Sequence, residues 1–400
     1  MNQSTEQAEF AKRIRVALKV IKQYQRPNHL KATIQIINSF IPFIGVWILM
    51  YLTWDYSFWL CFLLSILNAF FLVRIFIIQH DCGHKTFVRS SGARKVIGYV
   101  CSLFSSIPFF YWGKSHHFHH SHNGMLEVRD IGDITTLTVE EYKNLSRWGR
   151  FKYRLYRSTF VMFFLGPIYY VLIHNRLPLI KEEGFKKEEK GLWLYNVLYA
   201  GLITALCFLL DWKKFLLIHG MILSMFSVIA IWFFYIQHQH EHAYKEWRNK
   251  WEYLYAAVKG SSYYKLPALL NWFTGNIAIH HIHHLNPTIP NYNLKKSMNA
   301  ILWINKYTSE ISIWQSFRLA SNKLWDEATG RMITFKEFYK TGSRQLPKLL
   351  SLPILIFIYS AAIRNKFFFD SDCKDKSILM NNNRIDKLSV KKAIHVAVII

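Results

Sequence analysis

Residues 57–84 read SFWLCFLLSILNAFFLVRIFIIQHDCGH, an apolar run that ends in two histidines. The run 57–78 is long enough to cross a hydrocarbon core of about 30 Å as a single helix. His80 and His84 follow it with the spacing i, i+4, which places two side chains on one face of a helix. The stretch therefore predicts a membrane-spanning helix that presents a pair of imidazoles at the membrane boundary.

Three further apolar stretches have the length of membrane spans. Residues 33–53 precede the span 57–78 with only a few residues between them, and 192–210 precede 215–236 in the same way. Links this short predict two helical hairpins. We therefore expect an all-α integral membrane protein of about four spans, with a helical cap on the cytosolic side.

Two other segments, 96–111 and 158–175, are apolar but short, and the second is interrupted by Gly166 and Pro167. We expect them to lie in the membrane plane or to re-enter the membrane. The chain is 52% hydrophobic and carries a net charge of +25. Beside long apolar runs, this excess indicates contact with anionic lipid headgroups, and no nucleic-acid module is present. By the positive-inside rule, both termini, the segment between the hairpins and everything after residue 237 are expected in the cytosol.

The two ends of the chain differ from this membrane domain, which we place at 33–344. Residues 1–32 contain no signal peptide, and their spacing predicts a basic amphipathic arm that rests on a membrane. Its apolar residues are Phe10, Ile14, Val16, Leu18 and Ile21. Residues 345–400 form a C-terminal extension, either a further membrane contact or a segment without a catalytic role. Five cysteines without a Cys-x-x-Cys pair predict reduced thiols.

Fourteen of the 18 histidines fall in four clusters, all on the same predicted side of the membrane. Two clusters begin where spans end, and the other two lie in cytosolic segments. The clusters are His80 and His84; His116, His117, His119, His120 and His122; His238, His240 and His242; and His280, His281, His283 and His284. One shared site is therefore geometrically possible. The isolated His29, His174, His219 and His395 are expected to be solvated or hydrogen-bonded residues instead.

HHFHH (116–120) and HHIHH (280–284) repeat one pattern. On a helix, its first, fourth and fifth positions share a face, whereas the second is turned away by about 100°. Candidate metal ligands are therefore His80, His84, His116, His119, His120, His280, His283 and His284, without His117 and His281. Neutral imidazole suits Fe, Zn, Cu and Ni, and eight such ligands are too many for one ion. The pattern indicates two metal ions, but the spacing does not identify the element.

The stretches around these clusters resemble the membrane-bound fatty acid desaturases from about Leu64 to Phe335. HDCGHKTF (80–87) looks like the first histidine box of that family, and WGKSHHFHHSHNG (112–124) looks like its second. QHQHEHAY (237–244) and WFTGNIAIHHIHHLNPTIPNYNL (272–294) look like its third region. The sequences of these stretches are most similar to those of bacterial acyl-lipid desaturases of the delta-5 and omega-6 type.

The resemblance implies a non-haem diiron centre that uses O2 and two electrons to remove two hydrogens from an acyl chain. The eight histidines carry over by position as ligands of the two iron ions. A ninth ligand is expected before the third box, where we choose His238 over His240 and His242. Second-layer residues are expected to orient the ligands or a metal-bound water, although ordinary cap and loop roles stay open for the carboxylates. They are Asp81, Asp130, Asp133 and Asn276, the last one helical turn before His280.

The resemblance also implies a membrane lipid as substrate, with its acyl chain in a narrow apolar tunnel lined by the second and fourth spans. Basic residues at the entrance favour an intact phospholipid. No His-Pro-Gly-Gly motif of a fused cytochrome b5 is present, so a separate ferredoxin or flavodoxin is expected as electron donor. The expected location is the bacterial inner membrane.

Two other functions remain open. Lipid hydroxylases and ketolases share the histidine arrangement, so spacing does not separate them from desaturases. A membrane metal transporter is the alternative of another class. Transporters need ionisable residues in the middle of their spans, whereas these histidines cluster at the span ends and beyond.

Overall fold

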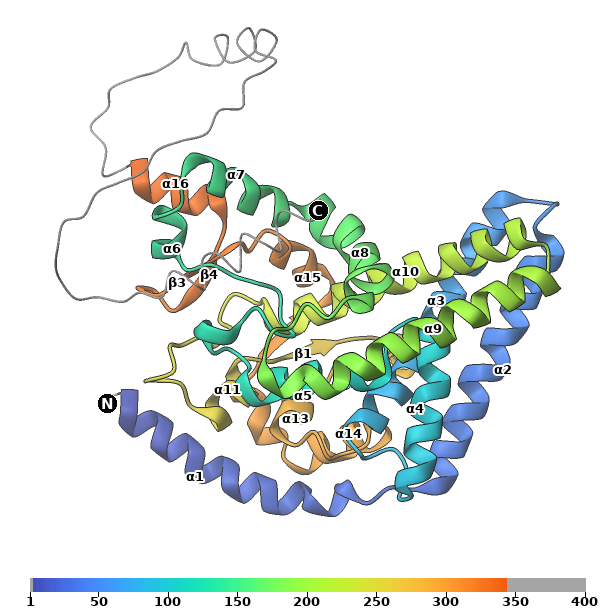
Figure 1. The fold of residues 1–400 in the computed structure, drawn as a ribbon. Helices are drawn as coiled ribbons and strands as arrows, with labels where there is room; N and C mark the ends of the chain where they lie inside the picture. The colour runs from blue at the N-terminus through green and yellow to red at the C-terminus, as the bar shows by residue number, and fades with distance from the viewer. Residues whose placement is uncertain (1–2, 344–400) are drawn as a thin grey trace, which may run out of the picture.

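Two antiparallel pairs of long helices carry the apolar runs of the sequence (Figure 1). In this computed structural model, which describes residues 3–343, the pairs are α2 (His29–Thr53) with α3 (Phe58–Gly83), and α9 (Lys186–Leu209) with α10 (Trp212–His238). All four helices are long and apolar enough to cross a membrane. The expected architecture of two hairpins is confirmed. The helices extend beyond the predicted spans mainly on the side of the histidine clusters, so α3 includes His80 and α10 includes His238.

The tips of the two hairpins lie together at the end of the molecule that is far from the cap (Figure 1). The side chain of Asp211 caps α10 by accepting a hydrogen bond from the Lys214 backbone N–H at 2.9 Å. Lys214 in turn forms an ion pair with Asp55 of the other hairpin. The hydroxyl of Tyr51 accepts from the Asp211 backbone N–H at 3.1 Å. These contacts join the hairpins at their turns.

The two shorter apolar segments form bent pairs of helices. The first pair, α4 (Ser91–Ser105) and α5 (Phe109–His122), bends by 97°, and Pro108 stands directly before α5. Helical geometry is disfavoured for the residue before a proline, here Ile107, which explains the break. The second pair bends by 51° between α7 (Arg147–Tyr156) and a segment that ends at Arg176. That segment comprises η3 (Val161–Leu165), α8 (Gly166–Leu172) and η4 (His174–Arg176). Each pair has the form of a broken span or a re-entrant loop.

Short elements form the cap at the histidine end of the hairpins (Figure 1). The helical ones are η2 (Leu126–Val128), α6 (Val139–Lys143), η5 (Glu183–Phe185), α11 (Tyr253–Lys259), α12 (Ala268–Phe273), α13 (His280–Leu285), α14 (Asn291–Ala300), η6 (Leu302–Tyr307), α15 (Ile313–Leu319) and α16 (Phe335–Ser343). Two small sheets are an addition to the expected all-helical fold. β1 (Ser262–Lys265) pairs in parallel with β2 (Ser309–Ser312), and β3 (Leu324–Asp326) pairs antiparallel with β4 (Arg331–Ile333). The Ser262 hydroxyl donates to the Ile236 carbonyl at 3.1 Å, which ties β1 to the end of α10.

The N-terminal arm, α1 (Gln3–Ile21) followed by η1 (Lys22–Gln25), packs across the cap. Phe10, Ile14 and Ile21 are buried against the protein. The Phe10 ring contacts the rings of Tyr255 and Tyr307 at centroid distances of 5.2 and 5.0 Å. Three of the five apolar residues that the sequence places on a membrane are therefore buried against the protein, whereas Val16 is exposed and the basic residues point outward.

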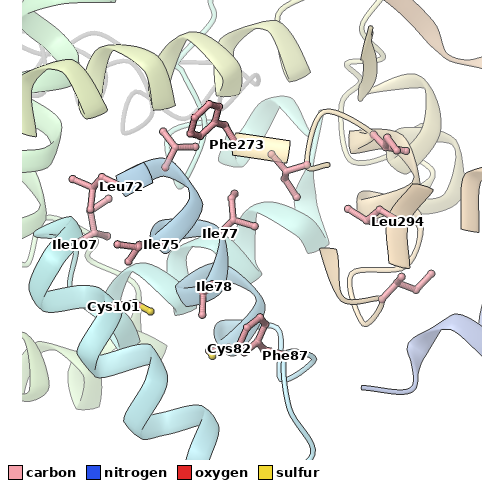
Figure 2. Packing of buried hydrophobic residues seen from close by; sticks show 14 of the residues in the cluster. Leu72, Ile75, Ile77, Ile78, Cys82, Phe87, Cys101, Ile107, Phe273 and Leu294 are labelled. Carbon is pink, nitrogen blue, oxygen red and sulfur yellow. The ribbon is translucent and has the colours of Figure 1, made fainter. Parts of the chain in front are cut away.

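The largest hydrophobic core surrounds the second half of α3 (Figure 2). Leu72, Ile75 and Ile78 of this helix have no exposed surface. They pack in one cluster with Cys101 of α4 and Leu294 of α14. The end of α3, which carries the first histidine pair, is thus held in the best-packed part of the fold.

The cysteines are reduced, as expected, wherever the structure describes them. Cys61, Cys82, Cys101 and Cys207 are free thiols. Cys373 and the proposed extension 345–400 lie outside the described residues.

Candidate metal centre

Nine histidines from all four clusters converge where α3, α5, α10 and α13 meet. Five of them offer ring nitrogens that all lie within 4.8 Å of one another. This five-histidine group consists of His80, His84, His116, His120 and His283. It draws two members from the end of α3, two from α5 and one from α13.

The remaining four histidines form a second group beside the first. The ring nitrogens of His119, His238 and His284 lie within 4.8 Å of one another. His280 joins them, because its Nε2 is 2.9 Å from Nε2 of His238 and its ring centroid is 4.6 Å from that of His284. We call these four residues the four-histidine group.

The repeated motifs HHFHH and HHIHH each contribute histidines to both groups, but in opposite proportions. The first motif contributes His116 and His120 to the five-histidine group and His119 to the four-histidine group. The second gives only His283 to the five-histidine group, whereas His280 and His284 lie in the other. Neither motif forms a complete group without the other, which explains why the chain contains both.

His117 and His281 lie outside both groups, in agreement with their position on a helix. The side chain of His117 is on the exposed side of α5. His281 is buried, and its Nε2 lies 3.1 Å from the amide oxygen of Asn305. Helical facing thus separates these two from their neighbours.

The three histidines after span four have different surroundings. His238 donates through Nδ1 to the Gly260 carbonyl at 3.1 Å, which leaves its Nε2 directed at the four-histidine group. His240 is buried outside both groups, and burial lowers its pKa to about 3. His242 is exposed. The structure therefore brings His238, and neither of the other two, to the site.

Asp81 contacts one histidine of the site without belonging to either histidine group. Its Oδ1 lies 3.0 Å from Nδ1 of His80. Its Oδ2 accepts two hydrogen bonds from Asn291, from the backbone N–H at 2.6 Å and from the side-chain amide at 2.8 Å. A carboxylate that binds one ring nitrogen fixes the tautomer and directs the other nitrogen at a metal. Asp81 therefore has the position expected of a residue that orients a ligand.

Asn276 does not lie on the helix of His280, contrary to the expectation from its spacing. Helix α13 begins only at His280, and Gly275 and Asn276 both adopt left-handed backbone angles, with φ of +55° and +60°. Two left-handed residues in succession cannot continue a right-handed helix. Asn276 is therefore part of a turn and does not share a helical face with His280.

Asp130 and Asp133 belong to the loop that precedes α6. The hydroxyl of Thr135 donates to Asp130 at 3.0 Å, and the backbone N–H of Ile134 donates to Asp133 at 2.7 Å. Both carboxylates also line the cavity described below. The structure thus gives them contacts within their own loop.

Burial decides the protonation state of the fourth cluster. It holds the pKa of His283 and of His284 well below the usual value, and the neighbouring imidazoles lower both further. These rings are therefore neutral at pH 7. Nε2 of His80 and Nε2 of His84 are buried without a hydrogen-bond partner among the described residues. Buried, neutral and unpartnered ring nitrogens are suited to bind a metal.

A cavity of about 690 Å³ leads to both groups. Its wall includes His80 and His116 of the five-histidine group and His280 of the four-histidine group. Most of the rest is apolar and comes from α3, α10 and α8. From α3 these residues are Val73, Phe76 and Ile77, and from α10 they are Ala230, Ile231, Phe233 and Phe234. The expected position of a tunnel between the second and fourth spans agrees with this cavity.

The wall of the cavity also contains polar side chains. His174, Lys181 and Glu182 line it together with Tyr169 and Tyr170. His174 is one of the isolated histidines for which a solvated role is expected from the sequence, and it stands in this wall. The cavity therefore combines an apolar wall beside the histidines with a set of polar side chains.

Two contacts of the site have no local signal in the sequence. Gly260 and Asn291 lie 22 and 210 residues from the residues they bond. Gly260 contributes through a backbone carbonyl, which has no residue type to recognise. Asn291 stands in the conspicuous stretch after the fourth cluster, but only the tertiary fold brings it to Asp81.

Comparison with known proteins gives one consistent family. A family model described as fatty acid desaturase matches residues 57–308. The chain is 40% identical to a fatty acid desaturase of Bacillus subtilis (strain 168) over 318 residues, which cover 80% of this chain and 90% of that protein. It is 23% identical to an sn-1 oleoyl-lipid 12-desaturase of Anabaena variabilis over 341 residues, 80% of this chain and 91% of that protein. It is also 26% identical to an endoplasmic reticulum omega-3 fatty acid desaturase of Vigna radiata over 59% of this chain and 63% of that protein.

The matched range 57–308 contains all four histidine clusters and the walls of the cavity. The Bacillus relative matches along nine-tenths of its own length. The resemblance noted from the sequence is thereby confirmed. Since family, fold and histidine arrangement agree, the chain belongs to the fatty acid desaturases, and it is an oxidoreductase that desaturates fatty acids in a membrane.

Proposed function

We propose that each histidine group holds one iron ion and that the enzyme desaturates the acyl chain of an intact phospholipid. The five-histidine group would bind one ion, and the four-histidine group, including His238, would bind the other. The observation that carries the proposal is the cavity, because a single apolar space reaches ligands of both groups. An acyl chain in it would lie beside both metal positions.

The donor set fits iron. All nine residues offer imidazole nitrogen, which suits Fe among the transition metals, and the family makes iron the natural choice within that range. Two iron ions bound there would supply the activation of O2, with two electrons from outside, that removal of two hydrogens from a saturated chain requires.

The protein itself would orient the ligands and exclude water. Asp81 and the Gly260 carbonyl fix the rings of His80 and His238, one in each group. The indole of Trp112 stacks on the His116 ring at a centroid distance of 4.6 Å, and both side chains line the cavity. Aromatic cover of this kind keeps water from the reacting carbon atoms.

The polar side chains in the cavity wall would hold the headgroup. The exposed ammonium group of Lys181 has the charge that binds a lipid phosphate, and the apolar walls of α3 and α10 would take the chain. The enzyme would sit in the bacterial inner membrane with its histidine side and both termini in the cytosol. Among residues 3–343, only two short turns lie at the far end of the hairpins and most basic residues lie on the cap side, which supports this orientation by the positive-inside rule.

The test is gas chromatography–mass spectrometry of derivatised fatty acids from a bacterial host with and without this gene. We expect a new double bond at one position, mainly in phospholipid-bound chains when lipid classes are separated first. Oxygenated chains without new double bonds would show a hydroxylase. New double bonds confined to free fatty acids would refute the phospholipid assignment.

A further inference from the structure

Helix α7 presents an apolar stripe to the outside of the molecule. Trp148, Phe151 and Leu155 share one face by their spacing i, i+3 and i+7, and all three are exposed. The rings of Trp148 and Phe151 stack at a centroid distance of 5.1 Å. The opposite face is fixed to the protein, because the Tyr153 hydroxyl donates to the Lys323 carbonyl at 2.7 Å. The stripe is therefore held outward, where no other part of residues 3–343 covers it.

The stripe continues onto two neighbouring elements. Phe160 and Phe164 are exposed in the segment that follows α7, and their rings stack at 5.8 Å. Trp314 and Phe317 of α15 are exposed by 82% and 58%, and α15 lies on the same side of the cap as α7 (Figure 1). We call the following residues the α7 surface: Trp148, Phe151, Leu155, Phe160, Phe164, Trp314 and Phe317. Exposed aromatic residues gathered in this way mark an interaction surface.

Helix α10 shows where this surface lies along the membrane normal. Trp232 of α10 contacts Phe317 at a centroid distance of 5.4 Å and Phe163 of η3 at 4.8 Å. It follows Trp212, the first residue of α10, by 20 residues, which is about 30 Å along the helix axis. A bilayer has a hydrocarbon core of about that thickness. With the hairpin tip at one boundary of the core, Trp232 and the α7 surface beside it lie at the other boundary.

The edge of the α7 surface is basic. Arg147 and Arg154 are exposed on α7, and the ammonium group of Lys152 lies 5.8 Å from the indole of the stripe. Neither residues 142–181 nor residues 311–325 contain a carboxylate. An aromatic and aliphatic face bordered by Lys and Arg is typical of a helix that lies in the headgroup layer. Cations at this level attract anionic lipids.

We propose that the α7 surface docks in the headgroup layer of the membrane, with anionic phospholipid as its ligand. The inference goes beyond the proposed function, because it needs the membrane spans but no reaction. It also gives the segment between the hairpins a membrane contact outside the two apolar stretches seen in the sequence. Val161, Met162 and Pro167, on the inner side of the segment that follows α7, line the cavity. Lipids held at the α7 surface would therefore adjoin the wall of the space proposed for the acyl chain.

A second copy of the chain is a poorer occupant of this surface. A symmetric dimer through α7 would bring Arg147, Lys152 and Arg154 of one copy toward the same cations of the other, and like charges across an interface are unfavourable. A bilayer with anionic headgroups complements both the apolar stripe and its basic edge.

The test uses the full-length enzyme in nanodiscs made of equal parts of phosphatidylcholine and phosphatidylglycerol. The photoreactive residue p-benzoylphenylalanine replaces Phe151, Trp314 or Asn249, one at a time. Asn249 is an exposed control before α11, which lies across the cap from α7 (Figure 1). After illumination, mass spectrometry of the digested enzyme identifies what is attached at each position. We expect attached phospholipid at positions 151 and 314, with a yield about tenfold or more above that at position 249.

Charge reversal tests the preference for anionic lipid. With the photoreactive residue at position 151, we expect phosphatidylglycerol to be attached about twofold or more over phosphatidylcholine. Arg147→Glu/Lys152→Glu should abolish this enrichment, whereas Arg248→Glu, at an exposed residue beside the Asn249 control, should keep it. The melting temperature of each variant verifies that it is folded.

Attachment of a second enzyme chain, or of a peptide from residues 344–400, in place of lipid at positions 151 and 314 would overturn the proposal. Yields of lipid no higher than at position 249 would do the same. Equal attachment of the two lipids in the enzyme without charge reversal would refute the anionic ligand. Crosslinking needs no turnover, so lipid attachment to an enzyme that forms no double bond would contradict the proposed function alone.

Discussion

The imidazole ring of His120 stacks on that of His284 at a centroid distance of 4.0 Å and an interplanar angle of 20°. The two residues belong to different histidine groups and to different helices, α5 and α13. Their contact joins the groups directly. A displacement of either helix would therefore disturb both groups, and we expect the site to gain and lose its metal as one unit.

Alanine at a histidine within the groups should abolish activity, whereas alanine at the outward-facing histidine of the same helix should not. We expect His120→Ala to reduce desaturation by about a hundredfold or more, and His117→Ala to retain most activity, because His117 is exposed. Double-bond yield per unit of enzyme, from the same host and assay, is the measurement. Equal losses in the two variants would refute the facing argument.

His281 allows a second comparison of this kind, within the motif HHIHH (280–284). His281→Ala removes the contact with Asn305 and leaves that amide unpaired, at a cost of about 1–3 kcal/mol in folding free energy. His283→Ala instead removes a member of the five-histidine group. We expect a lower melting temperature with substantial activity in the first variant and no detectable activity in the second. The idea fails if His281→Ala loses its iron while its melting temperature is unchanged.

Asp81→Asn should weaken the metal site without unfolding the cap. The amide keeps the size of the carboxylate but loses the charge that holds His80, so we expect a 10- to 100-fold decrease in metal affinity or activity, about the usual effect of such partners. Iron content after dialysis against a chelator measures it. Asp211→Asn at the hairpin tip is a matched control, and an equal loss of iron there would contradict the assignment.

The depth of the cavity should limit chain length. Ala230 lines it seven residues before Gln237, which is about 10 Å along the helix axis. Ala230→Phe would fill part of the apolar space, so we expect shorter chains among the unsaturated products and a lower yield from long ones. Leu217→Phe, on the exposed side of the same helix, is the control. An unchanged chain-length profile in Ala230→Phe, measured by mass spectrometry, would place the chain elsewhere.

Stability of the metal-free enzyme should decrease on mild acidification. Burial holds the pKa of His281 at about 4 and those of His283 and His284 well below the usual value, so the unfolded chain takes up protons first as the pH falls below about 6.5. Each such histidine then costs about 1.4 kcal/mol per pH unit until its folded pKa is reached. We expect a constant melting temperature above pH 7, a decrease toward pH 5, and a smaller decrease with iron bound. A melting temperature that rises on acidification would reverse this sign.

Local patterns were sufficient for the spans and for the facing of His117 and His281. Apolar length identifies a span wherever it occurs, and helical periodicity decides which of several neighbouring histidines share a face. These features depend on a few consecutive residues, which is why they could be predicted before the fold was known.

Other features depend on contacts that no local pattern contains. Asn276 was misplaced because the spacing assumed a continuous helix, whereas Gly275 and Asn276 form a left-handed turn. The arm was expected on a membrane, but Tyr255 and Tyr307, more than 240 residues away, cover Phe10. The division of nine histidines into five and four likewise follows from how α5 and α13 cross the ends of α3 and α10.

Metal analysis of the purified enzyme tests the central claim most directly. Inductively coupled plasma mass spectrometry should find about two iron ions per chain in the wild type. Because the groups are joined, His119→Ala and His84→Ala, one from each group, should both fall well below that value. One ion per chain, or zinc in place of iron in an enzyme that still forms double bonds, would contradict a two-iron site built from these nine histidines.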